Sequence, residues 1–284
     1  MTGFSPLQHE ADGLSAGLPP LLVAADRLAA SVSLGVHGRR RAGIGESFWQ
    51  FRRYQNEDAA RIDWRQSAKS QHLYVREREW EAAQTIWLWR DGGAGMDFSS
   101  HSVSKRERAE LLLLALAALL IRGGERVGFL GGGERPAASR LALMRIAHAL
   151  LDTKMQAHSL PPQTPIARGA GLVWLGDFLE PQALDTMRGL ARAGISGHLV
   201  RIVDPAEEDF PYTGRARFES PQGRDEALFG RAESVGDSYR ARFRAHGEEV
   251  VQTAMKLGWT VTSHRTDHAP LSALVALHAA IGGT

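Results

Sequence analysis

The chain has 284 residues, 43% of them hydrophobic, which is enough apolar material for one large globular domain, alone or with an appendage. Its 34 Lys and Arg residues nearly balance its 32 Asp and Glu residues, and a net charge of +2 does not indicate a nucleic-acid-binding protein. The absence of cysteine excludes disulfides, thiolate metal sites and a thiol nucleophile.

Nothing in the sequence indicates export or membrane insertion. The apolar stretch Leu18–Val23 is short and broken by proline, and no basic segment precedes it as in a signal peptide. The longest apolar run, Leu111–Ile121, falls well short of the roughly 18 residues of a membrane span. We therefore expect a cytoplasmic protein that does not itself insert into a membrane.

Residues 1–84 precede the first clear buried strand. Turn-rich sequence around Gly35–Gly38 and Gly43–Gly45 predicts a small β-containing N-terminal subdomain packed onto the rest of the protein. Within it, residues 39–79 hold nine Arg and one Lys against four Glu and two Asp, with six aromatic residues interleaved. Such a segment can bind single-stranded nucleic acid. We favour a buried network of ion pairs and cation–π contacts, because acids such as Asp63 can pair with the nearby arginines.

Residues 85–284 alternate short apolar runs with helix-length patterns, which is typical of βαβ units and a mainly parallel, doubly wound α/β sheet. The predicted strands are residues 85–90, 126–130, 171–175, 198–203 and 259–263. The predicted helices are residues 105–122, 139–151, 181–193, 233–257 and 270–281. Residues 204–230 interrupt this alternation with prolines, glycines and charges, so we expect an excursion there that can meet partners.

Two of these helices have distinctive local signals. Ser104 followed by Glu107 predicts a capping box at the start of the first helix, and Gly123–Gly124 predicts its end. In residues 139–151 we expect a buried face formed by Leu141, Ile146, Leu150 and Leu151.

An acid follows each of two predicted strands. Asp91 comes directly after the first strand and is followed by Gly92, Gly93, Ala94 and Gly95, and Asp177 comes after the third strand. Ligands of open α/β sheets bind at the carboxyl ends of the strands. The sequence therefore predicts a binding site formed by these two loops.

The N-terminal motifs resemble those of the bacterial domain of unknown function 58 family. The matching residues are Arg52-Arg53-Tyr54, Glu57-Asp58, Arg61-Ile62-Asp63-Trp64, Ser67-Ala68 and Leu73–Glu77, followed by an apolar strand that ends at Asp91. Gly176–Phe178 and Asp204-Pro205 are also similar to the family. We interpret Arg53, Tyr54, Asp58, Arg61, Asp63 and Trp64 as structural residues of this motif.

The resemblance implies a von Willebrand factor A-like domain at residues 85–284 and no agreed enzymatic activity. It also implies MoxR-type AAA+ ATPases and other von Willebrand A-like proteins as partners. Many members of the family carry membrane helices ahead of the motif, and this chain does not.

The resemblance also implies a metal-ion-dependent adhesion site, which is degenerate here. Asp91 and Asp177 match its two acids, but Gly93 and Gly95 stand in place of its two serines. Two carboxylates without these hydroxyls would bind magnesium weakly. We favour the alternative that both acids cap helices and accept hydrogen bonds from loop amides, without metal or cofactor.

Other chemical motifs are incomplete. His264 and His268 flank Asp267 with zinc-like spacing, but there is no third imidazole or thiolate nearby. Gly131–Gly133 lacks the Lys and Ser or Thr of a phosphate-binding loop, and there is no Gly-x-Ser-x-Gly nucleophile motif. We therefore expect a non-catalytic interaction module that works with a MoxR-type ATPase in assembling or activating protein complexes. A metal-dependent ligand binder and a hydrolase stay open as alternatives.

Overall fold

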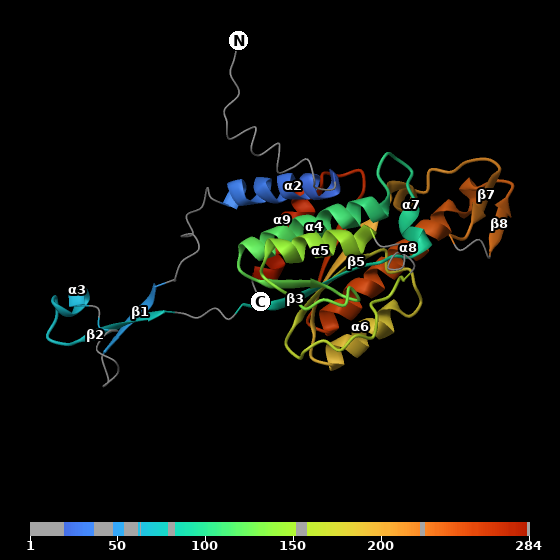
Figure 1. Cartoon of the computed structure of the whole chain (residues 1–284). Coiled ribbons are helices and arrows are strands. Elements are labelled where there is room, and N and C mark those ends of the chain that lie inside the picture. Colours follow the sequence, from blue (N-terminus) through green and yellow to red (C-terminus); the bar gives the residue numbers. More distant parts are fainter. Residues whose placement is uncertain are drawn as a thin grey trace, which may run out of the picture. The chain divides into compact units, whose positions relative to one another are not determined.

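The structure is a computed structural model of the whole chain, and it describes residues 20–36, 48–53, 62, 64–78, 83–151, 158–221 and 225–282 (Figure 1). The chain divides into two compact units, residues 36–83 and the remainder. The sequence interpretation placed residues 1–84 in one subdomain, whereas helix α2 (Pro20–Val36) belongs to the unit of the sheet.

Helix α2 joins the sheet unit through one apolar face. Leu22, Ala25, Ala29 and Val32 recur at helical spacing and are all buried in the main core. Pro20 occupies the first helical position, where its missing N–H has no helical partner to lose. Pro20, Leu21 and Leu22, which belong to the apolar stretch Leu18–Val23, therefore form the start of a helix.

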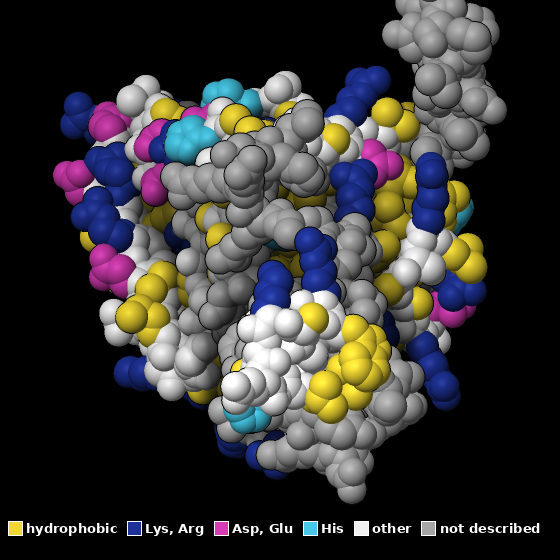
Figure 2. All heavy atoms as spheres, turned by 90° about the vertical axis from the view of Figure 1, so that its left-hand side faces the viewer, with side chains coloured by type: hydrophobic (Ala, Val, Ile, Leu, Met, Phe, Trp, Pro, Cys, Tyr) yellow, Lys and Arg dark blue, Asp and Glu magenta, His cyan; other side chains and the backbone are white. Residues whose placement is uncertain are grey.

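The smaller unit contains an antiparallel pair of strands, β1 (Phe48–Arg53) and β2 (Tyr74–Arg78), with the short helix α3 (Trp64–Ser67) between them. The Ser67 hydroxyl accepts a hydrogen bond from the Tyr74 N–H at 2.9 Å. Hydrophobic side chains reach the surface on the face shown in Figure 2. Among the described residues of the smaller unit, Trp64 and Leu73 are exposed large hydrophobic residues. The ion-pair network predicted around Asp63 lies outside the described residues and stays a prediction.

The larger unit is built on a parallel sheet of five strands in the order β4-β3-β5-β6-β9. The strands are β3 (Thr85–Arg90), β4 (Arg126–Phe129), β5 (Gly171–Gly176), β6 (Ser196–Val203) and β9 (Thr260–Arg265). All four neighbouring pairs are parallel, as predicted. β4 lies on one side of β3, and the next strand along the chain, β5, lies on the other side of β3. The topological switch point therefore lies between β3 and β5.

Helices cover both faces of this sheet (Figure 1). Helices α4 (Lys105–Arg122), α5 (Arg140–Leu151) and α9 (Pro270–Gly282) lie on one face, and α6 (Ala183–Arg192) and α8 (Glu233–Lys256) lie on the other. The capping box of Ser104 and Glu107 is present, with both reciprocal hydrogen bonds. This arrangement confirms the predicted doubly wound α/β fold. None of the helices in the described part of the chain is long and apolar enough to cross a bilayer.

The predicted buried face of α5 was partly wrong. Leu141 and Leu151 are 57% and 53% exposed. The face that packs on the core consists of Ala142, Leu143, Ile146, Ala147 and Leu150. Both exposed leucines lie off the buried stripe of α5, whose residues recur at the helical period, and α5 packs against α4 and β4.

The predicted excursion at residues 204–230 contains helix α7 (Pro205–Asp209) and a two-stranded hairpin of β7 (Ala216–Glu219) and β8 (Glu226–Phe229). Aromatic side chains join these pieces: the ring centroids of Phe210 and Phe218 are 5.5 Å apart, and those of Phe218 and Phe229 are 5.8 Å apart. Aromatic contacts therefore hold α7 and the two strands of the excursion together.

Candidate functional site

The two acids predicted from the strand ends meet at the switch point. Asp91 follows β3, and its N–H donates to the carbonyl of Leu175 in β5 at 2.8 Å. The two loops approach so closely that a Cβ atom on Gly176 would lie 2.9 Å from Asp91 Cβ. Asp177 is the next residue, and glycine at 176 therefore allows both carboxyl groups to occupy one site.

Asp91 is buried in a setting that disfavours its charge. Burial, and then the nearby Asp177 carboxylate, raise the pKa of Asp91 from 3.8 to about 7, although a hydrogen bond from the Gly93 N–H to Oδ1 at 2.7 Å opposes the shift. A substantial fraction of Asp91 is therefore neutral at neutral pH, unlike an ordinary surface aspartate.

Asp177 shares a buried lysine with Glu207. Lys105 is fully buried, and its Nζ lies 2.9 Å from Asp177 Oδ2 and 2.5 Å from Glu207 Oε1. Burial alone would lower the pKa of Lys105, but the two carboxylates outweigh burial and raise it. The lysine is therefore a fixed internal cation that neutralises acids from two different loops.

Helix capping holds this ion-pair group in place. Lys105 is the first residue of α4, directly after the Ser104 cap. Glu207 belongs to the capping box of α7, in which its carboxylate accepts from the N–H of Asp204 at 3.0 Å. Lys105 and Glu207 were not predicted as site residues, although Ser104 with Glu107, and Asp204 with Glu207, have the sequence spacing of the capping boxes that position them.

The expectation that Asp91 and Asp177 cap helices was wrong, because the helices that follow them, the 3-10 helix Ala94–Asp97 and α6, have Gly93 and Gln182 at their N-cap positions. Both acids instead accept from loop amides two residues ahead, Asp91 from Gly93 and Asp177 from Leu179. The other half of the favoured interpretation, hydrogen bonding to loop amides, is confirmed.

The glycines of the first loop are packed against polar groups. A Cβ atom on Gly93 would clash with the hydroxyl of Ser159, and one on Gly95 would lie 3.1 Å from Asp177 Oδ2. Ser159 belongs to the segment that follows α5, and it was not predicted. A hydroxyl from another loop therefore stands where a side chain at position 93 would lie.

These residues fit a magnesium ion poorly. The ammonium of Lys105 already contacts the Asp177 oxygen that faces the site, and a cation at this position would repel it. Within the described ranges there is no group of three or more Asp, Glu, His or Cys side chains arranged for a metal. His264 is buried, whereas the side chain of His268 is mostly exposed and lies 3.8 Å from Asp267, which is itself paired with Arg265.

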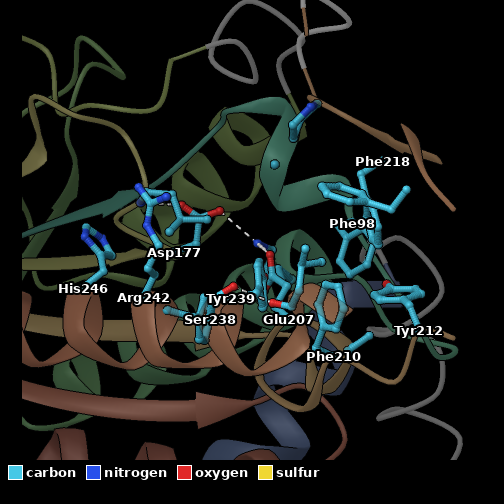
Figure 3. Close-up of a pocket in the computed structure, with 18 residues that line it drawn as sticks. Phe98, Asp177, Glu207, Phe210, Tyr212, Phe218, Ser238, Tyr239, Arg242 and His246 are labelled. Atoms are coloured by element: carbon cyan, nitrogen blue, oxygen red, sulfur yellow. Dashed lines mark hydrogen bonds and ion pairs between the residues drawn. The ribbon is translucent and has the colours of Figure 1, made fainter. Parts of the chain in front are cut away.

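A cavity of about 700 Å³ opens beside this ion-pair group (Figure 3). Phe98, Phe210, Tyr212 and Phe218 gather at one end, and Asp177, Arg242 and His246 lie at the other, with Glu207 and Tyr239 between them. The walls come from the excursion, α8 and the loop after β5. The cavity therefore has an aromatic end and a charged end.

Phe210, which lines this cavity, and Phe178, which lies between the lining residues Asp177 and Leu179, have strained backbone. Phe178 and Phe210, with φ angles of 59° and 48°, are the two non-glycine residues with left-handed backbone in the described part of the chain. Such conformations cost on the order of 1–3 kcal/mol and need support from their surroundings. At Phe178 the support includes His246, whose Nε2–H donates to the Phe178 carbonyl at 2.9 Å.

The fold and the site define a class, namely a doubly wound α/β protein with a parallel five-stranded sheet, in which a buried lysine pairs with acids at the carboxyl edge. The chain belongs to the DUF58 family, described as proteins of unknown function, whose model matches residues 50–249. The resemblance drawn from the Arg53 to Trp64 motif is confirmed.

Similar proteins occur in several bacteria. Uncharacterized proteins of Mycobacterium bovis and Mycobacterium tuberculosis are each 26% identical over 255 residues, which cover 82% of this chain and 78% of the relative. Among solved structures, the conserved hypothetical protein BatB of Bacteroides thetaiotaomicron aligns with a TM-score of 0.40 and 16% identity, over 71% of this chain and 98% of that one. An aerotolerance-related membrane protein of Bacteroides fragilis aligns with a TM-score of 0.39 and 16% identity, over 71% and 100%.

Proposed function

We propose that the protein is a non-catalytic interaction module that binds a protein partner at the carboxyl edge of its sheet. The observation that carries this proposal is the Lys105 ammonium between Asp177 and Glu207. It neutralises the carboxylates that would otherwise hold a metal or transfer protons, while an aromatic cavity large enough for a ligand opens beside them. This combination supports recognition in preference to catalysis.

The proposed partner is a MoxR-type AAA+ ATPase, as the family resemblance implies, with other von Willebrand A-like proteins as further partners. Binding would assist the assembly or activation of protein complexes in the cytoplasm. The excursion forms much of the proposed docking surface, because its aromatic residues line the cavity.

Two neighbouring residues of β8 provide a test variant and a control variant for binding at the cavity. Phe229 lines the cavity, whereas Leu228 is exposed and does not line it. AAA+ ATPases captured from the native host with the full chain would be identified by mass spectrometry, purified and titrated against each variant. We expect Phe229→Ser to weaken binding about tenfold or more, because a buried aromatic side chain often dominates an interface. Leu228→Ser should bind like the wild type.

Absence of any AAA+ protein in the capture, or equal binding by the wild type and Phe229→Ser, would count against the proposal. Far-UV circular dichroism and thermal denaturation of both variants separate a binding defect from unfolding.

A divalent-metal-dependent ligand binder is the second candidate, and the closeness of Asp91 and Asp177 favours it. A cation between the two carboxyl groups would relieve the repulsion that helps to raise the pKa of Asp91. Calorimetry with magnesium or manganese distinguishes the candidates. A submillimolar response that disappears in Asp91→Ala would replace the proposed function with this one.

A further inference from the structure

The cavity has the dimensions and composition of a ligand site. Its volume of about 700 Å³ lies within the range of roughly 300–1,000 Å³ that is usual for such sites. Seven of its eighteen lining residues are Phe or Tyr, and several of these rings pack on one another: the ring centroids of Phe210 and Tyr239 are 4.7 Å apart, and those of Phe210 and Tyr212 are 5.2 Å apart. The aromatic end is thus preorganised for an apolar group.

Among the described residues, the charged end contains one cation that makes no hydrogen bond or ion pair. Asp177 and Glu207 both bind Lys105, and His246 donates to the Phe178 carbonyl. Arg242 lines the same end, and its guanidinium makes no hydrogen bond or ion pair with another described residue. A guanidinium is a planar donor that matches a carboxylate in two parallel hydrogen bonds. The group that complements this end is therefore a carboxylate.

The surface around the cavity is larger than a small ligand would cover. Phe98 and Leu179 line the cavity and remain 37% and 45% exposed. A second hollow of about 240 Å³ adjoins the first and reaches the Asp91 loop. The two hollows share Gly95, Asp177, Leu179 and Pro221. A groove with two connected compartments fits an extended segment of polypeptide.

We propose that this groove binds a segment of the partner protein in which an apolar side chain stands next to a carboxylate. The apolar side chain enters among Phe210, Phe218 and Tyr239, and the carboxylate pairs with Arg242. This inference rests on the proposed interaction function and specifies the chemistry that the partner presents.

Three capped peptides test the charge preference: acetyl-Leu-Phe-Glu-amide, acetyl-Leu-Phe-Gln-amide and acetyl-Leu-Phe-Lys-amide. Titration of the full chain, followed by NMR or calorimetry, should rank them in the order Glu, Gln, Lys. The Glu peptide should bind up to about fivefold more tightly than the Gln peptide, which is the upper value for a solvent-exposed ion pair.

Two variants in α8 test whether Arg242 causes the preference for the Glu peptide. Arg242→Gln should bind the Glu and Gln peptides equally and still bind both, because the aromatic end is intact. Arg244→Gln is the matched control, since Arg244 lies two residues further along α8, is exposed and lines a different cavity. It should retain the preference for the Glu peptide.

Octanoate and octylammonium distinguish a peptide site from a lipid site. If octanoate binds and none of the peptides does, the groove takes small amphipathic acids and the inference is overturned. A peptide preference that is unchanged in Arg242→Gln also overturns it, even if the ATPase still binds through Phe229 and the proposed function stands. Conversely, an Arg242-dependent preference without any AAA+ partner supports the inference and removes only the proposed partner.

Discussion

Two of the buried cations in the sheet unit, Lys105 and Arg201, differ in how their charge is satisfied. Lys105, at the carboxyl edge, is fully buried and contacts two carboxylates at 2.9 and 2.5 Å. Arg201, in β6, is only 9% exposed, but its Nε and Nη2 have no hydrogen-bond partner among the described residues. We therefore expect Lys105 to stabilise its surroundings and Arg201 to reduce the stability of the protein.

The surroundings of Arg201 accommodate its shape without satisfying its donors. The ring of Phe243 lies 4.6 Å from the guanidinium carbon, and Gly247 of α8 leaves the room that Nη1 occupies. Burial lowers the pKa of Arg201, and Glu208 opposes this shift from a distance. Arginine nevertheless stays charged in proteins, so the penalty of burial persists.

Replacement of Lys105 should have the largest effect on stability. Lys105→Met leaves Asp177 and Glu207 buried without their shared cation, and removing one member of a buried ion pair costs about 3–5 kcal/mol. Urea denaturation at pH 7 measures the change in the free energy of unfolding.

Arg188→Met provides the control, because the pair of Arg188 with Asp185 lies at the surface of α6. A surface pair contributes about 0–1 kcal/mol. Equal losses in the two variants would show that the Lys105 group is no more important than a surface pair.

Asp91 makes a pH-dependent contribution at the same edge. The folded protein retains the Asp91 proton up to about pH 7, whereas the unfolded chain releases it near 3.8. Between these values the folded state binds more protons, so the stability contributed by this group falls as the pH rises, by at most about 1.4 kcal/mol per pH unit. Asp91→Asn cannot ionise, and its amide oxygen can still accept from Gly93.

The stability of Asp91→Asn relative to the wild type should therefore increase from pH 4 to pH 7 and stay constant above pH 7. Denaturant unfolding of both proteins at several pH values measures this difference, in which contributions from the other titrating groups cancel. Parallel stability curves would mean that Asp91 ionises in the folded protein as it does in the unfolded chain.

The features that were predicted correctly from the sequence have local signals. The strand residues 85–90 and the ends of α4 were predicted correctly, because apolar runs and capping boxes are local. The meeting of Asp91 and Asp177 followed from the rule that parallel strands share a carboxyl edge. Local patterns were therefore sufficient for the fold and for two site residues.

The rest of the site depends on contacts between distant residues. Lys105 and Glu207 are 102 positions apart, and no periodicity indicates that they pair. Ser159 fills the space beside Gly93 only because the segment after α5 returns to the switch point. The aromatic cavity likewise requires the excursion to fold back onto α8, which its scattered Phe and Tyr residues do not indicate.

Replacement of Arg201 should have the smallest effect and the opposite sign. Arg201→Met removes two buried donors without partners, each costing about 1–3 kcal/mol, and loses a cation–π contact of about 0.5–2 kcal/mol. We expect a net gain of about 1 kcal/mol, or a rise of about 2–4 °C in Tm for a unit of this size. Arg240→Met, which breaks contacts with Asp237 and the Asp209 carbonyl, should give no such gain. A fall in the Tm of Arg201→Met in differential scanning calorimetry would mean that Arg201 stabilises this side of the sheet, as Lys105 does at the carboxyl edge, and the comparison would no longer hold.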